Sequence, residues 1–398
     1  MKNILKSTLL LLCAVCLFTA CDDDNDSNPT LQTPTSFRLN VPATTNSVID
    51  LANSTKINLT CNQPDYGFPA QTVYTVDVAT KPDMSDAVTL SSKFPTTKLD
   101  LDAAEVAATL TSQMVAQGKK DSDFPMTIPV YFRAKAFVTA AASSTGEPVD
   151  SSTVVYSNTV ALNKVNLVFS LPPVHCPDNL YVVGNFCGWN WDKCVPMIEV
   201  YGVRDNANTS TKFWRMVYID ESGIKFNSSK AWNGSEVGFS GITVDAASDN
   251  ASTIQANADG NISSSAPGWY LMVVQATVNG RNIDYNVTFN KPNVYLIGTA
   301  VGGWDELNPA GLFTVPATAD GDFVSPKLPT LPGNDDDGCI RMYVKVPGYD
   351  WWKSEFIVGG TFGTTLTYRA TGGDQDRVGC AAGQQVHLHF ADDTGDIK

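Results

Sequence analysis

Apolar and polar residues alternate with a period of two along most of the chain, and Gly, Pro, Asn and Asp interrupt the alternation at short intervals. This pattern is typical of short β-strands that bury one face and are joined by turns. Within residues 35–165 it predicts strands at 56–61, 72–78, 128–134 and 157–162. Several short strands at such spacing favour an immunoglobulin-like sandwich.

One segment, residues 103–118, has a helical period instead. Val106, Leu110 and Met114 follow one another at intervals of four residues, and Gly118 provides a stop signal. Because side chains four residues apart share one face of a helix, this spacing predicts a short helix. The remainder of the pattern predicts an all-β fold.

Beyond residue 165 the chain repeats itself. Leu-Tyr-Val-Val-Gly at residues 180–184 is matched by Val-Tyr-Leu-Ile-Gly at residues 294–298, 114 residues further on. Near the other end of the repeat, residues 268–280 are matched by residues 383–395 at an offset of 115. A nearly constant offset at both ends indicates two tandem copies of one β-sandwich module rather than a solenoid of many short repeats.

We name these copies module 1 (residues 166–291) and module 2 (residues 292–398). They follow the predicted immunoglobulin-like domain at residues 35–165. The sequence of module 2 stops at Lys398, before a counterpart of residues 284–289 of module 1. We therefore expect the final strand of module 2 to be shortened or absent.

The first residues have the features of an export signal. Lys2 and Lys6 precede an apolar run at residues 8–18 that is too short to span a membrane, which predicts a secretory signal peptide at residues 1–20. Small residues stand directly before Cys21, as in a bacterial lipobox, so we predict cleavage there and lipidation of Cys21. A plain secretory signal cleaved at the same point is the alternative.

Residues 21–34 contain four aspartates and suit a flexible acidic tether.

The charge of the whole chain limits the classes of molecule that it can bind. Over the whole chain the formal net charge is −14, and charged residues make up only 17% of the total. Nucleic-acid binding needs clustered Lys and Arg, so we exclude nucleic acid as a partner, whereas a neutral glycan is compatible with this charge.

Six cysteines lie beyond the predicted lipidation site, and export permits disulfides. They include no CxxC pair, and His387 and His389, which share one face of a predicted strand, lack an evident third ligand. The sequence therefore predicts no metal site and no cofactor. Disulfide pairing stays open among these thiols: Cys61, Cys176, Cys187, Cys194, Cys339 and Cys380.

Catalysis is a function class that the sequence argues against. Glycoside hydrolysis needs two carboxyl groups that flank the scissile bond, whereas the Asp and Glu residues here lie mostly in polar loops. The chain has no GxSxG, HExxH or phosphate-binding P-loop motif. We therefore expect a protein that is not an enzyme.

Tryptophan gives the strongest functional signal, because all eight tryptophans lie beyond residue 188. An exposed indole offers an apolar platform to the C–H face of a sugar, while nearby polar side chains bond the hydroxyls. The candidates for glycan contact stand among Gly, Asn, Asp and Lys: Trp189, Trp191 and Trp232 with Lys230 in module 1, and Trp304, Trp351 and Trp352 with Lys353 in module 2.

For each tryptophan the alternative is a structural role in a β core. Trp214 and Trp269 lie in alternating strand segments, and we expect them to be core residues. Neighbouring residues of a strand point to opposite faces, so we expect Trp351 and Trp352 to diverge unless a bulge intervenes, leaving one of them in the site.

The order of these parts resembles the SusE and SusF outer-membrane lipoproteins of the Bacteroidetes starch-utilisation system, with a layout closest to SusE. The resemblance is carried by the lipobox cysteine with its acidic run, the tryptophan-free sandwich and the two repeats, and it covers essentially the whole chain. It implies two carbohydrate-binding modules, each holding a glucan against paired aromatics with Lys or Arg at the sugar oxygens. The matching positions are Trp191, Trp232 and Lys230 in module 1, and Trp304, Trp351, Trp352 and Lys353 in module 2.

The resemblance also implies a location and partners. The protein is expected at the outer membrane, exposed on the cell surface and held only through the lipid at Cys21, beside a SusC-like transporter and a SusD-like glycan-binding protein. We therefore expect non-catalytic binding of starch or a related α-glucan that retains it for uptake. One alternative is a structural or adhesin-like lipoprotein with a protein partner, which predicts buried tryptophans. The other is a hydrolase, which predicts paired carboxylates in a cleft.

Overall fold

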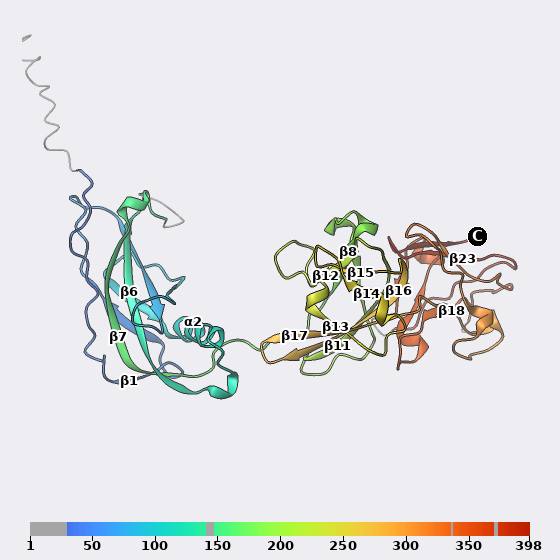
Figure 1. Cartoon of the computed structure of the whole chain (residues 1–398), viewed down its shortest axis with the longest axis horizontal. Helices are drawn as coiled ribbons and strands as arrows, with labels where there is room; N and C mark the ends of the chain where they lie inside the picture. The colour runs from blue at the N-terminus through green and yellow to red at the C-terminus, as the bar shows by residue number, and fades with distance from the viewer. Residues whose placement is uncertain (1–29, 141–146, 336, 370–372) are drawn as a thin grey trace, which may run out of the picture. The chain divides into compact units, whose positions relative to one another are not determined.

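The computed structural model describes residues 30–140, 147–335, 337–369 and 373–398 (Figure 1). It divides into two compact units, Met1–Pro172 and Pro173–Lys398, and the second unit contains module 1 from residue 173 onward and all of module 2. The predicted signal peptide, Cys21 and the acidic run lie outside the described residues. Among the helices of the described part, none is long and apolar enough to cross a membrane.

The first unit is a β-sandwich with one helix. Its larger sheet has the order β1 (Val48–Asp50), β7 (Val155–Leu167), β6 (Met126–Val138), β3 (Thr72–Ala79) and β4 (Val88–Thr89). Its smaller sheet pairs β2 (Lys56–Thr60) with β5 (Lys98–Asp102), and two short 3₁₀ turns complete the unit, η2 (Asp121–Asp123) and η3 (Ser151–Thr153). The strands predicted at 56–61, 72–78, 128–134 and 157–162 are confirmed as β2, β3, β6 and β7.

The helix predicted from the four-residue spacing is confirmed as α2 (Ala103–Ala116). The Asp102 side chain caps it by accepting hydrogen bonds from the amides of Ala104 and Glu105 at 2.7 and 3.2 Å. Val106 and Leu110 are fully buried in the core between the two sheets. The apolar stripe of α2 therefore closes the sandwich.

Module 1 is a sandwich of two five-stranded sheets. The first has the order β10 (Ile198–Glu199), β11 (Ser210–Ile219), β16 (Gly268–Asn279), β17 (Asn282–Asn290) and β13 (Ile242–Val244). The second has the order β14 (Ile254–Ala256), β15 (Ile262–Ser264), β12 (Ile224–Asn227), β8 (Tyr181–Gly184) and β9 (Val195–Pro196). The connections between these strands contain four 3₁₀ turns: η4 (Asn185–Cys187), η5 (Trp191–Lys193), η6 (Phe239–Gly241) and η7 (Ala251–Thr253).

Module 2 repeats this plan with shorter strands. Its first sheet has the order β18 (Val294–Leu296), β20 (Met342–Val344), β21 (Glu355–Ile357) and β22 (Thr367–Tyr368), and its second has β19 (Phe323–Val324), β23 (Val386–His389) and β24 (Thr394–Ile397). The final strand β24 has 4 residues where β17 of module 1 has 9, as expected from the sequence. Its 3₁₀ turns are η8 (Thr299–Val301), η9 (Pro309–Gly311), η10 (Trp351–Ser354) and η11 (Gly360–Phe362).

The two modules share a hydrophobic core, which makes them one unit. Along β11, Phe213 and Val217 face the core inside module 1, whereas Trp214 and Met216 face a core built with strands of module 2. Strand β16 divides its side chains in the same way. Because the sheet is covered on both faces, its central strands are almost continuously apolar. The prediction that Trp214 and Trp269 are core residues is confirmed, since both are buried.

A buried ion pair crosses this contact between the modules. Arg215 on β11 has no exposed surface, and its guanidinium lies 2.8 Å from the Asp393 carboxylate of module 2. The same guanidinium donates to the Phe390 carbonyl at 2.6 Å and to the Tyr368 hydroxyl at 3.2 Å. These bonds hold module 1 and module 2 in one packing arrangement.

Candidate functional site

Two tryptophans of module 2 form an aromatic pair, in which Trp304 is exposed and Trp351 is partly buried. Trp304 and Trp351 have ring centroids 5.7 Å apart with their planes tilted by 38°. Trp304 follows η8, where Gly298 takes a φ of +81° that favours glycine, and the Trp304 indole lies against the Gly298 backbone. Trp351 begins η10, and its backbone amide donates to the Glu306 carboxylate at 3.2 Å. The Trp304 ring is thus positioned by the Gly298 backbone, and Trp351 is positioned by the Glu306 carboxylate.

A guanidinium lies beside this tryptophan pair. The Arg341 Cζ atom is 5.8 Å from the ring centroid of Trp304 and 5.8 Å from that of Trp351. The residue stands just before β20, and its backbone carbonyl accepts a hydrogen bond from the Ile297 amide at 3.0 Å. A cation at this position can stabilise the tryptophan faces and donate to hydroxyl groups of a ligand held between the rings.

An ion network orients Arg341. Its guanidinium donates to Glu355 at 2.7 Å and to Asp374 at 3.2 Å. Arg369 donates to the other oxygen of Glu355, also at 2.7 Å. Burial raises the pKa of Glu355 above its usual value, even though both arginines oppose that shift. Burial acts in the same direction on Asp374, but hydrogen bonds from Arg341 and Arg377 hold the pKa of that carboxyl well below its usual range. Asp374 therefore stays ionised at neutral pH and keeps Arg341 in place.

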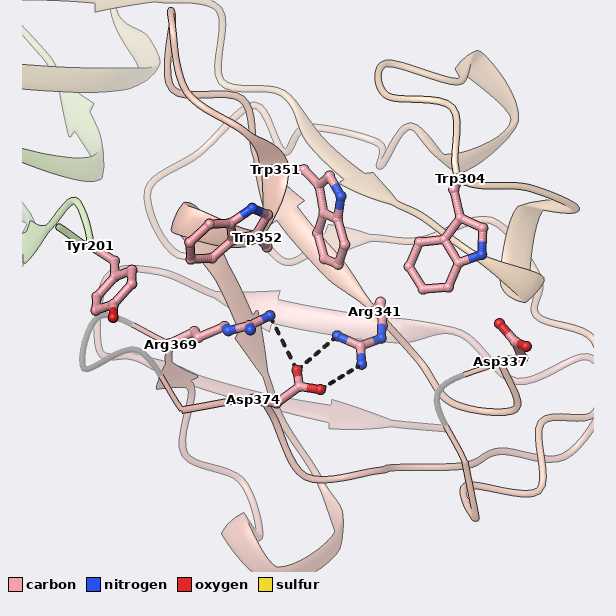
Figure 2. Close-up of a pocket in the computed structure, with 8 residues that line it drawn as sticks. All are labelled: Tyr201, Trp304, Asp337, Arg341, Trp351, Trp352, Arg369 and Asp374. Atoms are coloured by element: carbon pink, nitrogen blue, oxygen red, sulfur yellow. Dashed lines mark hydrogen bonds and ion pairs between the residues drawn. The ribbon is translucent and has the colours of Figure 1, made fainter. Parts of the chain in front are cut away.

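These side chains line a cavity of about 690 Å³ (Figure 2). In Figure 2 the aromatic rings lie along one side, and Arg369, Asp374 and Arg341 lie along the other. Trp351 and Trp352 both line it, so the expectation that they diverge was wrong. They belong to the 3₁₀ turn η10 rather than to a strand, and residues of a turn do not alternate between two faces. The full lining is Tyr201, Trp304, Asp337, Arg341, Trp351, Trp352, Arg369 and Asp374.

Module 1 contains a second pair of the same kind. The rings of Trp189 and Trp232 are 6.4 Å apart and tilted by 34°. Trp189 has a φ of +57°, which costs a bulky L-residue about 1 kcal/mol or more and is found most often where function fixes the backbone. The cavity beside this pair measures about 410 Å³, and its lining is Trp189, Ser222, Lys225, Trp232, Asp259 and Asn261.

Lys225 is the counterpart of Arg341. In module 1, Lys225 on β12 is paired with Val183 on β8. In module 2, Arg341 accepts a hydrogen bond from Ile297, which stands 114 residues after Val183. Both modules therefore place a cation opposite the corresponding residue of their first strand segment, Val183 or Ile297, and beside a tilted tryptophan pair.

The structure corrects the role expected of Trp191. Its side chain is only 5% exposed and packs in a small cluster with Val183, Cys187 and Cys194. Its ring meets that of Trp232 edge-on, at 5.2 Å and 61°. Trp191 therefore packs against Trp232 from the interior of the module, and its own ring face is not accessible to a ligand. The Gly and Asn residues around it indicated exposure, but η5 turns the ring inward.

The two lysines chosen from the sequence lie outside both cavities. The Lys230 ammonium stands 5.1 Å from the Tyr181 ring, and the Lys353 ammonium 5.5 Å from the Trp352 ring. Lys225 and Arg341, rather than Lys230 and Lys353, line the cavities beside the tryptophan pairs. Sequence reasoning missed these two cations, although each follows an isoleucine at the corresponding point of its repeat, Ile224 at the start of β12 and Ile340 just before β20. It also missed Tyr201, Arg369 and Asp374.

Two family profiles match the chain. Residues 179–286 and 293–396 each match the profile of a family described as SusF/SusE starch specific CBMs, which stands for carbohydrate-binding modules. Residues 23–135 match the profile of the SusE outer membrane protein family. The chain belongs to the SusF/SusE family, and the resemblance inferred from the sequence is confirmed.

One curated relative is the outer membrane protein SusF of Bacteroides thetaiotaomicron. It is 35% identical over 247 residues, which are 60% of this chain and 47% of the relative, so the chain spans about half the length of that protein. A solved structure, the crystal structure of SusF from Bacteroides thetaiotaomicron, superposes with a TM-score of 0.39 at 21% identity over 91% of this chain and 99% of that chain.

Proposed function

We propose that this chain binds starch or a related α-glucan without cleaving it, through the tryptophan pairs of modules 1 and 2. The observation that carries the proposal is the repetition of one constellation. Each module presents a tilted tryptophan pair beside a cation, Lys225 on β12 in module 1 and Arg341 just before β20 in module 2. The starch-specific description of the matching family supports the choice of ligand.

The tilt of the rings also favours an α-glucan. The planes of the two pairs meet at 34° and 38°, and the rings of each pair line a cavity, so each pair forms a bent platform. A flat, ribbon-like glucan would be met best by coplanar rings. The curved face that α-1,4-linked glucose units present fits a bent platform, where each ring stacks on one sugar.

Exposure of the platform argues against a purely structural role. Trp232 is 54% exposed and Trp304 is 46% exposed. A structural or adhesin-like lipoprotein predicts buried tryptophans, and these two rings are among the most exposed large apolar side chains of the described residues. Large exposed aromatic surface is costly in water and is typical of a binding site.

Two carboxylates near the module 2 platform, Asp374 and Glu355, are poorly suited to hydrolysis. A general acid needs a raised pKa, but the pKa of Asp374 is held below its usual range by arginine hydrogen bonds that oppose the effect of burial. Glu355, whose pKa is raised by burial, has only 1% exposed surface and is bonded to Arg341 and Arg369. Neither carboxylate is arranged to protonate a glycosidic oxygen.

We further infer that the protein acts at the outer membrane surface. The predicted lipidation of Cys21, the acidic tether and the outer-membrane description of the matching family support this location. Binding there would retain glucan for a SusC/SusD-type uptake system. The membrane is then contacted through the lipid alone.

A granule assay separates the three function classes. The soluble chain (residues 27–398) is mixed with insoluble starch, and both the bound protein and the reducing sugar released are measured. The proposal predicts bound protein and no reducing sugar above a protein-free blank. Release of reducing sugar would indicate a hydrolase, and absence of bound protein would favour a protein partner.

The two lysines of module 1 make a matched test of the site. With module 2 silenced by Trp304→Ala and Trp351→Ala, Lys225→Met should weaken maltoheptaose binding about tenfold, because a hydrogen bond from a charged donor is worth about 1.5 kcal/mol. Lys230→Met should change the affinity by less than about twofold, since Lys230 lies outside the cavity. Calorimetric titration measures both, and equal effects would contradict the assignment of Lys225.

A further inference from the structure

The aromatic lining of module 2 extends beyond its tryptophan pair. We propose that this site continues onto a second aromatic pair, Trp352 with Tyr201 of module 1, and therefore holds a longer glucan segment than the module 1 site. The inference rests on the proposed function and adds a length preference. It also makes the module 2 site dependent on a residue from the other module.

The second pair has the same construction as the first. Its rings are 5.6 Å apart and tilted by 57°. The Arg369 Cζ atom lies 5.2 Å from the Trp352 ring, as Arg341 lies beside the first pair. Figure 2 shows Tyr201, Trp352, Trp351 and Trp304 in succession along one side of the cavity. The cavity thus contains a continuous row of four rings, and each pair has its own guanidinium.

The buried Glu355 joins the two halves of this row. One of its oxygens accepts from Arg341 and the other from Arg369, both at 2.7 Å. A single carboxylate with 1% exposed surface therefore sets the spacing of the two guanidinium groups. This shared anchor indicates one extended site rather than two unrelated hollows.

Tyr201 is held in place before any ligand arrives. The preceding residue, Val200, is fully buried in the core that both modules share, and its amide donates to the Lys212 carbonyl at 2.9 Å. An ion pair between Glu199 and Arg204 at 2.7 Å closes the base of the loop. Tyr201 itself keeps 36% of its surface exposed. A fixed and exposed ring loses little conformational entropy on binding.

Among the described residues, the lining of the module 1 cavity includes no second aromatic pair. Asn233 follows Trp232 at the position that Trp352 holds after Trp351. Its amide group is engaged within its own loop, accepting from Asn227 and donating to Ser229, both at 3.1 Å. The module 1 cavity is also the smaller one, at about 410 Å³ against about 690 Å³. A short segment of glucan therefore fills it.

Ligand length tests the proposal. In residues 27–398 with module 1 silenced by Trp189→Ala and Trp232→Ala, maltotriose and maltoheptaose are titrated calorimetrically. Tyr201→Ala and Trp352→Ala should each lower the affinity for maltoheptaose about five- to tenfold, the contribution of one aromatic contact, and change that for maltotriose less than about twofold. Tyr201→Phe keeps the ring and should retain the affinity.

The possible results distinguish failure of this proposal from failure of the proposed glucan-binding function. If Trp304→Ala weakens binding strongly while Tyr201→Ala and Trp352→Ala affect neither ligand, the extension is wrong and the proposed function stands. Equal losses for both ligands would also overturn the length preference. If neither ligand binds the chain with all its tryptophans intact, the proposed function fails and the extension with it. Unchanged thermal unfolding of each variant verifies that the fold is retained.

Discussion

Replacing Trp304 by alanine is expected to lower the affinity of module 2 for maltoheptaose about 30-fold, with module 1 silenced by Trp189→Ala and Trp232→Ala. Trp304 forms half of the first platform and is 46% exposed. Loss of a central aromatic contact of this kind costs about 2 kcal/mol, which is about 30-fold in affinity at room temperature. Calorimetric titration of the soluble chain measures it.

A matched control lies three residues further on. Leu307 is similarly exposed, at 47%, and does not line the cavity. Leu307→Ala should therefore leave the affinity within about twofold of its starting value. A comparable loss in both variants would mean that the loop rather than the indole face determines binding, and would contradict the assigned platform.

The second large effect concerns the contact between the modules. Asp393→Ala should destabilise the second unit by about 3–5 kcal/mol, because it leaves the Arg215 guanidinium buried without its carboxylate. For a unit of this size, about 2–4 °C per kcal/mol corresponds to a fall in melting temperature of about 6–20 °C. Differential scanning calorimetry of residues 27–398 measures the shift.

Two control variants separate charge burial from general damage. Asp396 is an exposed carboxylate paired with Lys398, so Asp396→Ala should change stability by less than about 0.5 kcal/mol. Removing both partners, by Arg215→Met with Asp393→Leu, should cost less than Asp393→Ala alone, since no unpaired charge is then buried. If Asp393→Ala is no more harmful than Asp396→Ala, Arg215 does not couple the modules.

Much of the fold could be predicted because its strands bury one face. The alternation in residues 35–165, the spacing of Val106, Leu110 and Met114, and the repeat offset of 114 each have a direct structural cause, and each prediction is met. The shared core of the modules could not be predicted in this way. Strands β11 and β16 are apolar on both faces, and a continuous apolar run does not say what covers its second face.

The site was predictable in its residue types more than in its geometry. Loop composition led us to expect exposed rings at Trp232 and Trp304, which are exposed, and at Trp191, which is buried, because Gly and Asn indicate a turn and not the direction of a ring. The cations Lys225 and Arg341 were missed because each is a single polar residue among apolar ones, and a solvated side chain is the usual interpretation of such a residue. Tyr201 joins module 2 only through the packing of the two modules, which depends on contacts between residues far apart in the chain.

The central claim is that the tryptophan pairs bind α-glucan, and affinity electrophoresis tests it most directly. Residues 27–398 are run in native gels that contain amylopectin, dextran, xyloglucan, pectin or levan, beside a variant with alanine at Trp189, Trp232, Trp304 and Trp351. The account predicts retardation in the amylopectin gel and free migration of the variant. Equal migration of both proteins in every gel would contradict it.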